Sequence, residues 1–126
     1  SAGYYDAYYT KALKIREMIK EDLKNNAFSK VDLILTPTTP NTAFPVLESF
    51  SMSPVEMYLN DIYTVFANIA GLPAISIPAG LSTEKLPMGM QIIGDRFQED
   101  KIFKVSDVIE KCADFNKLKK EITRIV

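Results

Sequence analysis

Over residues 4–26, near the start of the chain, apolar and polar residues follow one another with the period of a helix. Apolar side chains recur three or four residues apart, at Tyr5, Tyr8, Ala12, Ile15, Ile19 and Leu23. Lysines and glutamates fill the opposite face of the same segment. This period predicts an amphipathic helix that ends near Asn25-Asn26.

Three short apolar runs have the length of strands: "VDLILT" (31–36), "AISIP" (74–78) and "MGMQIIG" (88–94). The first run leads into "TPTTPNTAFP", which holds three prolines in ten residues. An extended loop is predicted there, because proline lacks the amide donor and restricts the residue before it. Only the polar stretch "LSTEKLP" separates the other two runs, so they are predicted to form a hairpin or to be neighbours in one sheet.

The segment "SPVE" has the features of a helix N-terminus. Ser53 is the predicted N-cap, Pro54 occupies the first helical position, and Glu56 completes a capping box. The helix that starts here is predicted to bend or break near residues 60–61.

Two further helices follow from the pattern. One covers residues 62–70 and ends at Gly71, since glycine readily adopts the left-handed backbone of a helix C-terminus, and Pro73 prevents continuation. The other covers residues 100–115, and its inner side is predicted to comprise Ile102, Phe103, Val105, Val108, Ile109 and Cys112. A short amphipathic tail is predicted over residues 117–125.

The order helix, strand, helix, strand, strand, helix is typical of an α/β fold. Its strands are too few to close a sheet of their own comfortably. The first residue is Ser1 rather than methionine, and the first helical pattern starts almost at once. These features predict a piece of a longer protein that is incomplete on its own.

Composition narrows the function classes. Fifteen basic and sixteen acidic residues give a net charge of −1, which argues against a nucleic-acid surface. The absence of histidine excludes a Ser-His or Cys-His nucleophile pair and a histidine metal site within these 126 residues. The single cysteine, Cys112, excludes an internal disulfide, fits a reducing compartment and is predicted to be a core thiol. No apolar run reaches the roughly 18 residues of a membrane span.

Asp61 is the sharpest candidate for a functional residue, because it is set in the apolar run "MYLNDIYTVFANIAG". An ionised carboxylate buried in such surroundings must be paired or hydrogen-bonded. One reading is that Asp61 caps the helix over 62–70. The other is that it binds a cationic group, such as the ammonium of an amino acid, in a mostly apolar pocket. The two readings are compatible, since a carboxylate accepts several hydrogen bonds.

Two further groups of residues, one of tyrosines and one of threonines, have either a structural or a functional role. The tyrosines near the N-terminus either pack through their large rings or direct one hydroxyl into a ligand pocket; they are Tyr4, Tyr5, Tyr8 and Tyr9. The threonines of the proline-rich loop either border an active site or serve only as turn residues; they are Thr36, Thr38 and Thr39. Gln91, on the last predicted strand, needs partners for its amide, which we expect at a sheet edge or a loop.

Taken together, "SAGYYDAYY", "DLILTPTTPNTAF", "MYLNDIYTVFANIAGLPAISIPAG" and "LPMGMQIIG" resemble the C-terminal part of the amidase signature family. More narrowly, they resemble the branch that supplies ammonia to tRNA-dependent amidotransferases. The resemblance covers residues 1–115 and leaves residues 116–126 as a charged tail. It implies the C-terminal portion of a mixed sheet flanked by helices.

The resemblance also implies a chemistry. Enzymes of this branch use a Ser–cis-Ser–Lys triad, whose serine attacks the side-chain amide of glutamine. No part of that triad matches this chain, nor does the arginine expected to hold the glutamine carboxylate, so the chain alone is expected to be inactive. Asp61 matches the family aspartate that contacts the α-ammonium of glutamine, which makes it the predicted substrate-binding residue.

The implied partners are the B and C subunits of the amidotransferase, glutamine and a charged tRNA, Glu-tRNA(Gln) or Asp-tRNA(Asn). ATP and Mg²⁺ are expected in the partner subunit, and no cofactor is expected in this chain. The implied compartment is a bacterial cytoplasm or an organelle. Two alternatives stay open: the same region of a stand-alone amidase for another amide, and a non-catalytic binding or scaffold module.

Overall fold

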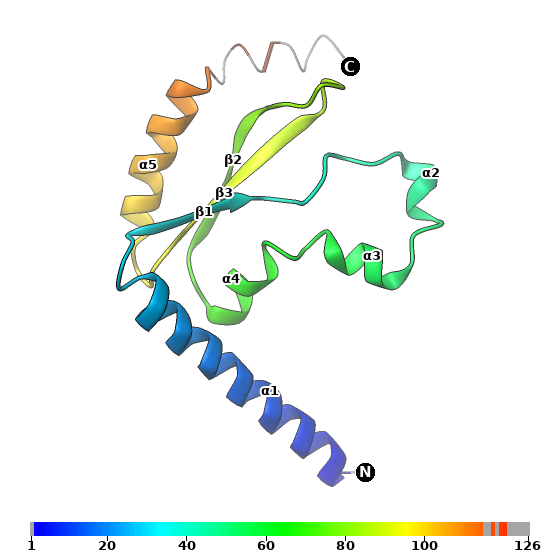
Figure 1. Cartoon of the computed structure of the whole chain (residues 1–126), viewed down its shortest axis with the longest axis vertical. Helices are drawn as coiled ribbons and strands as arrows, with labels where there is room; N and C mark the ends of the chain where they lie inside the picture. Colours follow the sequence, from blue (N-terminus) through cyan, green and yellow to red (C-terminus); the bar gives the residue numbers. More distant parts are fainter. Residues whose placement is uncertain (1, 115–116, 118, 121–126) are drawn as a thin grey trace.

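A three-stranded antiparallel sheet organises the chain in the computed structural model, which describes residues 2–114, 117 and 119–120 and the side chains from residue 6 onward (Figure 1). The strands are β1 (Leu33–Pro37), β2 (Ala74–Leu81) and β3 (Pro87–Gly94), in the order β1-β3-β2. The α/β prediction and the predicted hairpin are confirmed. A mixed sheet needs parallel pairs, and these described strands make none.

The helices flank this sheet and extend from it. They are α1 (Ala2–Asp22), continued by a π-helical turn (Leu23–Ala27), α2 (Val46–Ser49), α3 (Pro54–Leu59), α4 (Val65–Ala70) and α5 (Glu99–Cys112). The predicted bend near residues 60–61 is confirmed by the gap between α3 and α4. The four-residue α2 was not predicted, because a single turn carries no apolar period. The predicted tail over 117–125 lies largely outside the described residues.

Local capping explains where the central helices start and stop. The Ser53 hydroxyl accepts from the Glu56 amide at 3.3 Å, while the Glu56 carboxylate accepts from the Ser53 amide at 2.7 Å. The predicted capping box is therefore confirmed. The hydrogen bond that the Glu56 carboxylate accepts from the Ser53 amide, and after it the nearby Ser53 hydroxyl, lower the pKa of Glu56. Gly71 ends α4 in the left-handed conformation, with φ at 68°, as predicted.

The core lies between α5 and one face of the sheet. Ile77 of β2, Ile92 of β3 and Ile102 of α5 are buried together. Leu33, Ile75, Met90, Val105 and Ile109 pack against them. Antiparallel pairing aligns the strand residues, and a spacing of three and four aligns those of the helix.

Three residues expected on the inner side of α5 are instead exposed. Phe103 is 63% and Val108 56% exposed, and Cys112 is exposed as well, so the core-thiol prediction is wrong. On an ideal helix these residues project about 80–120° away from Ile102, onto the flanks. Ser106 takes the vacated inner position, where it is buried and donates to the Ile102 carbonyl at 2.7 Å.

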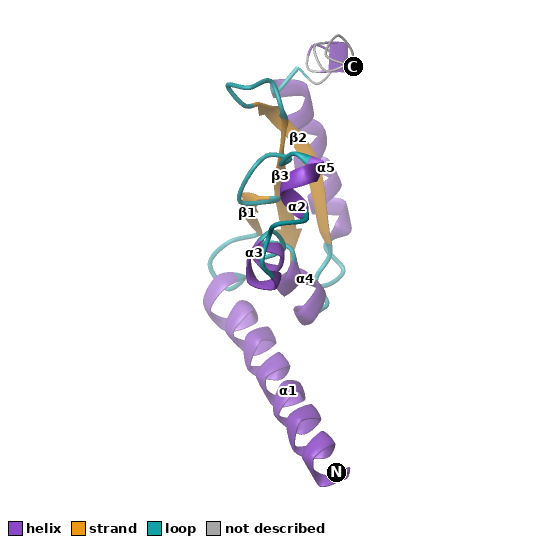
Figure 2. Ribbon diagram, turned by 90° about the vertical axis from the view of Figure 1, so that its right-hand side faces the viewer, coloured by secondary structure: helices purple, strands orange, loops and turns teal. Residues whose placement is uncertain are grey.

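The helix α1 is present as predicted, but its apolar stripe is largely uncovered. Figures 1 and 2 show it projecting away from the sheet. Tyr8 and Ile15 are exposed, whereas Ile19 and Leu23 near its C-terminal end are half-buried. The short helix α4 is the main element that contacts α1 from elsewhere in the chain. A six-residue helix is too short to cover a stripe that spans five turns.

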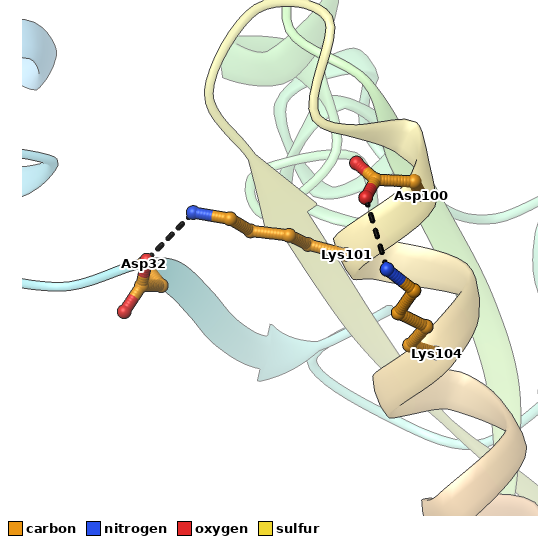
Figure 3. A network of polar contacts seen from close by, with 4 residues as sticks. All are labelled: Asp32, Asp100, Lys101 and Lys104. Carbon is orange, nitrogen blue, oxygen red and sulfur yellow. Dashed lines mark hydrogen bonds and ion pairs between the residues drawn. The ribbon is translucent and has the colours of Figure 1, made fainter.

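An ion pair joins α5 to the segment before β1 (Figure 3). The Lys101 ammonium lies 2.7 Å from the Asp32 carboxylate, and Lys104 lies 3.2 Å from Asp100 within α5. The hydrogen bond from Lys101 lowers the pKa of Asp32, and the same bond raises the pKa of Lys101. The pair links elements that are 69 positions apart in the sequence.

This pair predicts a specific pH dependence of folding. Because the pKa of Asp32 is lowered, its stabilisation is present above the unfolded-state pKa and is lost as pH falls through the folded-state value. Because the pKa of Lys101 is raised, that contribution is lost only when pH rises through its folded-state value. Asp32→Asn should therefore reduce stability slightly at neutral pH and not at strongly acidic pH, and salt should weaken the difference. Urea unfolding at several pH values measures the free energy of unfolding of the variant and the parent chain. Asp107→Asn is the control, because the ion pair that it removes, with Lys111, lies within α5 and joins no other element.

Candidate functional site

A row of polar side chains crosses the sheet on the face opposite α5. Thr36 of β1, Gln91 of β3 and Ser76 of β2 are direct partners in the strand register. Side chains alternate between faces along a strand, so these three point away from the face that carries Ile77 and Ile92. Gln91, at the centre of the row, is only 4% exposed.

The Gln91 amide connects the sheet to the turn between α3 and α4. Its Nε2 donates to the Thr36 hydroxyl at 3.1 Å and to the Tyr63 carbonyl at 2.7 Å. A primary amide nitrogen has two hydrogens, so these bonds use its full donor capacity. The prediction that Gln91 finds a loop contact is confirmed.

Asp61 lies in that same turn. Its main-chain carbonyl accepts from the amides of Thr64 at 3.0 Å and Val65 at 2.9 Å, and from the Thr64 hydroxyl at 3.2 Å. The N-cap of α4 is Thr64, so the prediction that the Asp61 side chain caps this helix is wrong. Asp61 contributes its main chain instead.

The carboxylate of Asp61 is exposed rather than buried, contrary to the expectation from its apolar neighbours. Met57, Leu59 and Ile62 are exposed as well. The apolar residues are distributed around two short helices and a turn, and the described part of the chain places no layer over them. Within those residues, no hydrogen bond or ion pair reaches the Asp61 carboxylate.

An open cavity of about 590 Å³ lies beside this turn. Asn60, Ile62 and Tyr63 line it from the turn, while Asn41 and Phe44 line it from the proline-rich loop. Asp61 is not a lining residue, but its two chain neighbours are. The proline-rich loop therefore borders the space next to the candidate residue.

The three threonines of the loop have different partners. Thr36 bonds Gln91, Thr38 bonds the Ser76 hydroxyl at 2.7 Å, and Thr39 donates to the Asn41 carbonyl at 2.8 Å. Thr39 thus acts as a turn residue, and together with Thr36 it lines a second cavity of about 690 Å³. Thr36 also belongs to the polar row across the sheet, and Thr38 is joined to that row through Ser76.

Ser76 and Gly89 were missed by the sequence reasoning. Gly89 has no space for a side chain, since an added Cβ would lie 2.8 Å from the Thr38 hydroxyl and 3.0 Å from that of Ser76. This close approach lets Thr38, directly after β1, make a hydroxyl contact with Ser76 of β2 across β3. The polar position between two isoleucines in "AISIP" was the available signal for Ser76.

The two tyrosines of the N-terminal cluster whose side chains are described lie outside the core. Tyr8 and Tyr9 are more than half exposed. Tyr9 lines a groove between α1 and α4 together with Asn68 and Ile69, rather than the cavity beside Asp61. The side chains of Tyr4 and Tyr5 lie outside the described residues.

Metal-binding and membrane-spanning features are both missing from the described residues. In the part of the chain that the structure describes, no group of three or more cysteine and carboxylate side chains is arranged to hold a metal ion. None of the helices described there has both the length and the apolar character that crossing a membrane requires.

Comparison with known proteins gives consistent matches over most of the chain. The family described as Amidase matches residues 1–103. The chain is 54% identical over 113 residues to the glutamyl-tRNA(Gln) amidotransferase A subunit of Azorhizobium caulinodans, and 56% identical over 115 residues to that of Parvibaculum lavamentivorans. These matches cover 90% and 91% of this chain but 23% of each relative, so the chain spans about a quarter of their length and corresponds to a C-terminal part of them.

Solved structures give the same result. The crystal structure of the glutamyl-tRNA(Gln) amidotransferase A subunit from Thermotoga maritima matches with a TM-score of 0.78 and 50% identity, over 87% of this chain and 24% of that chain. A bacterial aryl acylamidase of the amidase signature family matches with a TM-score of 0.66 and 25% identity, over 90% of this chain and 24% of that chain. The small sheet with its flanking helices is thus part of a larger fold in these proteins.

Proposed function

Because this chain belongs to the amidase family, we propose that it forms the C-terminal part of the glutamine-hydrolysing subunit of a tRNA-dependent amidotransferase. The observation that carries the proposal is the match to several amidotransferase A subunits, more than half identical over nine-tenths of the chain. The lower identity to an aryl acylamidase makes a stand-alone amidase the second reading.

The reaction we propose for the whole subunit is hydrolysis of the glutamine side-chain amide. A serine outside this chain attacks the amide carbon, ammonia leaves, and water then releases glutamate from the acyl-enzyme. The ammonia passes to a B subunit, which holds ATP and Mg²⁺ and amidates the activated carboxylate of Glu-tRNA(Gln) or Asp-tRNA(Asn). A C subunit completes the proposed complex. We place this complex in a bacterial cytoplasm or an organelle, as the resemblance implies.

Within this chain, Asp61 is the proposed contact for the α-ammonium of glutamine. Three features support the assignment. The carboxylate is exposed, no described side chain satisfies it, and its chain neighbours line an open cavity. A charge-assisted hydrogen bond to an ammonium among apolar neighbours is stronger than a neutral one, and it favours an amino-acid substrate over a simple amide.

An uncovered apolar surface on α2 and α3 supports the view that this chain is completed by more polypeptide. Six of its residues are at least half exposed: Val46, Leu47, Phe50, Val55, Tyr58 and Leu59. Large apolar side chains left exposed together on neighbouring segments are typical of an interface. We propose that the remaining three-quarters of an amidase-length polypeptide cover it and supply the nucleophile.

A chimaeric subunit tests the proposal. In the Thermotoga maritima protein, the segment that this chain matches is replaced by the present sequence, and ammonia release from glutamine is measured with the parent protein as control. We expect glutamine hydrolysis by the chimaera and none by this chain alone. A chimaera that hydrolyses simple amides but not glutamine would favour the stand-alone amidase instead.

A further inference from the structure

The buried carboxamide of Gln91 has no role in the proposed function as stated so far. It sits on the central strand, and its hydrogen bonds reach residues 55 and 28 positions away in the sequence. A side chain that is 4% exposed keeps an amide only if its polar atoms are satisfied. An apolar residue here would fill the space without connecting the sheet to the turn.

A single peptide unit links Gln91 to Asp61. The Tyr63 carbonyl accepts from Gln91 at 2.7 Å, and the amide at the other end of that peptide, Thr64 N, donates to the Asp61 carbonyl at 3.0 Å. The Tyr63–Thr64 peptide is thus held at both ends, by a side chain of the sheet and by the main chain of Asp61. Hydrogen bonds arranged in series polarise and strengthen one another.

We propose that Gln91 is a positioning residue for substrate recognition: through the Tyr63–Thr64 peptide it sets where the Asp61 carboxylate lies relative to the substrate ammonium. This inference rests on the proposed function of Asp61. The central strand is held on both sides by neighbouring strands, so it is a rigid reference for an exposed turn. Recognition of a charged group depends on such support, because small displacements weaken an oriented contact.

The neighbouring threonine provides a matched control. Thr36 accepts the other hydrogen bond of the same amide but does not touch the turn. Thr36→Val removes that bond at nearly constant volume and leaves the Tyr63 bond in place. Gln91→Met removes both bonds, so the difference between the two variants isolates the link to Asp61.

The test measures discrimination in the chimaeric subunit. The ratio of kcat/KM for glutamine to kcat/KM for glutaramate, which is glutamine without its α-amino group, reports recognition of the ammonium. We expect Gln91→Met to lower this ratio about tenfold, the equivalent of one hydrogen bond, while Thr36→Val changes it little. Asp61→Asn should lower it further, and adding Gln91→Met to Asp61→Asn should cause no additional loss, because both act on one contact.

Each other outcome has a defined meaning. If Gln91→Met lowers kcat/KM equally for both substrates, its role is only structural and the inference is overturned. If Asp61→Asn changes the ratio but Gln91→Met does not, Gln91 is excluded while the proposed function stands. If the unmodified chimaera shows no preference for glutamine over glutaramate, the proposed role of Asp61 is itself wrong.

A second variant covers the case in which Gln91→Met does not fold. In Gln91→Glu, the neutral carboxylic acid donates one hydrogen bond to the Tyr63 carbonyl, whereas the ionised form donates none. The discrimination ratio of this variant should therefore rise as pH falls through the titration of the new acid, relative to the unmodified chimaera. A ratio that follows the same pH profile in both proteins overturns the inference.

Discussion

Asp61→Ala in the chimaeric subunit is expected to raise the KM for glutamine steeply and to leave kcat at saturation nearly unchanged. In the complete subunit, where we propose that further polypeptide covers this part of the chain, the substrate ammonium would be buried without its counter-charge, which costs on the order of 2–5 kcal/mol. A loss of this kind appears in KM because the contact is present in the ground state and the transition state alike. Initial rates of ammonia release over a wide range of glutamine concentration measure both parameters.

Glu84 provides the control for that experiment. It is another exposed carboxylate, between β2 and β3, and it is not a lining residue of the cavity beside the Asp61 turn. Glu84→Ala removes the same charge from a different part of the surface and should leave the KM within about twofold. Folding of the Asp61→Ala protein should be unaffected, because the side chain is exposed and has no described partner to lose. An unchanged KM in Asp61→Ala would contradict the assignment.

Ile92→Ala is expected to destabilise the chain by about 2–5 kcal/mol, the usual cost of a large-to-small change in a core. Ile92 is fully buried on the central strand and packs with Ile77 and Ile102. Few of the described residues are as completely buried, so a cavity here removes a large share of the packing among them. Urea unfolding of the chain, followed by far-ultraviolet circular dichroism, gives the free energy of unfolding.

Leu35 is the matched control for the core prediction. It is the direct partner of Ile92 in the register of β1 and β3 and shares its face of the sheet, but it is 50% exposed. Leu35→Ala should cost much less, since an exposed site leaves no closed cavity. Equal losses in the two variants would mean that the core is not centred on β3.

Local rules predicted the elements well because their causes lie within a few residues of one another. The capping box at Ser53, the left-handed Gly71 and the hairpin between β2 and β3 each depend on hydrogen bonds or backbone preferences of adjacent residues. The same reasoning failed for Phe103 and Cys112 on α5. An apolar residue on the flank of a helix is buried only if another element reaches it.

The candidate site shows the same division. The sequence singled out Asp61 by its chemistry and Gln91 by its need for partners. It did not reveal that one peptide unit connects them, because that link joins residues 28 positions apart. Periodicity along one segment carries no information about which distant carbonyl a buried amide meets.

By itself, the sequence determined the types of all the described elements except the single-turn helix α2 and the π-helical turn after α1, together with most of their limits, the α/β class and the residues from which we propose that a recognition site is built. Only the tertiary structure decided that Asp61 is exposed, that its main chain rather than its side chain supports α4, and that Gln91 holds the turn to the sheet. The physical reason is that secondary structure follows from short-range hydrogen bonding and side-chain period. Burial and long-range contact instead depend on which other surfaces the chain brings to the same place.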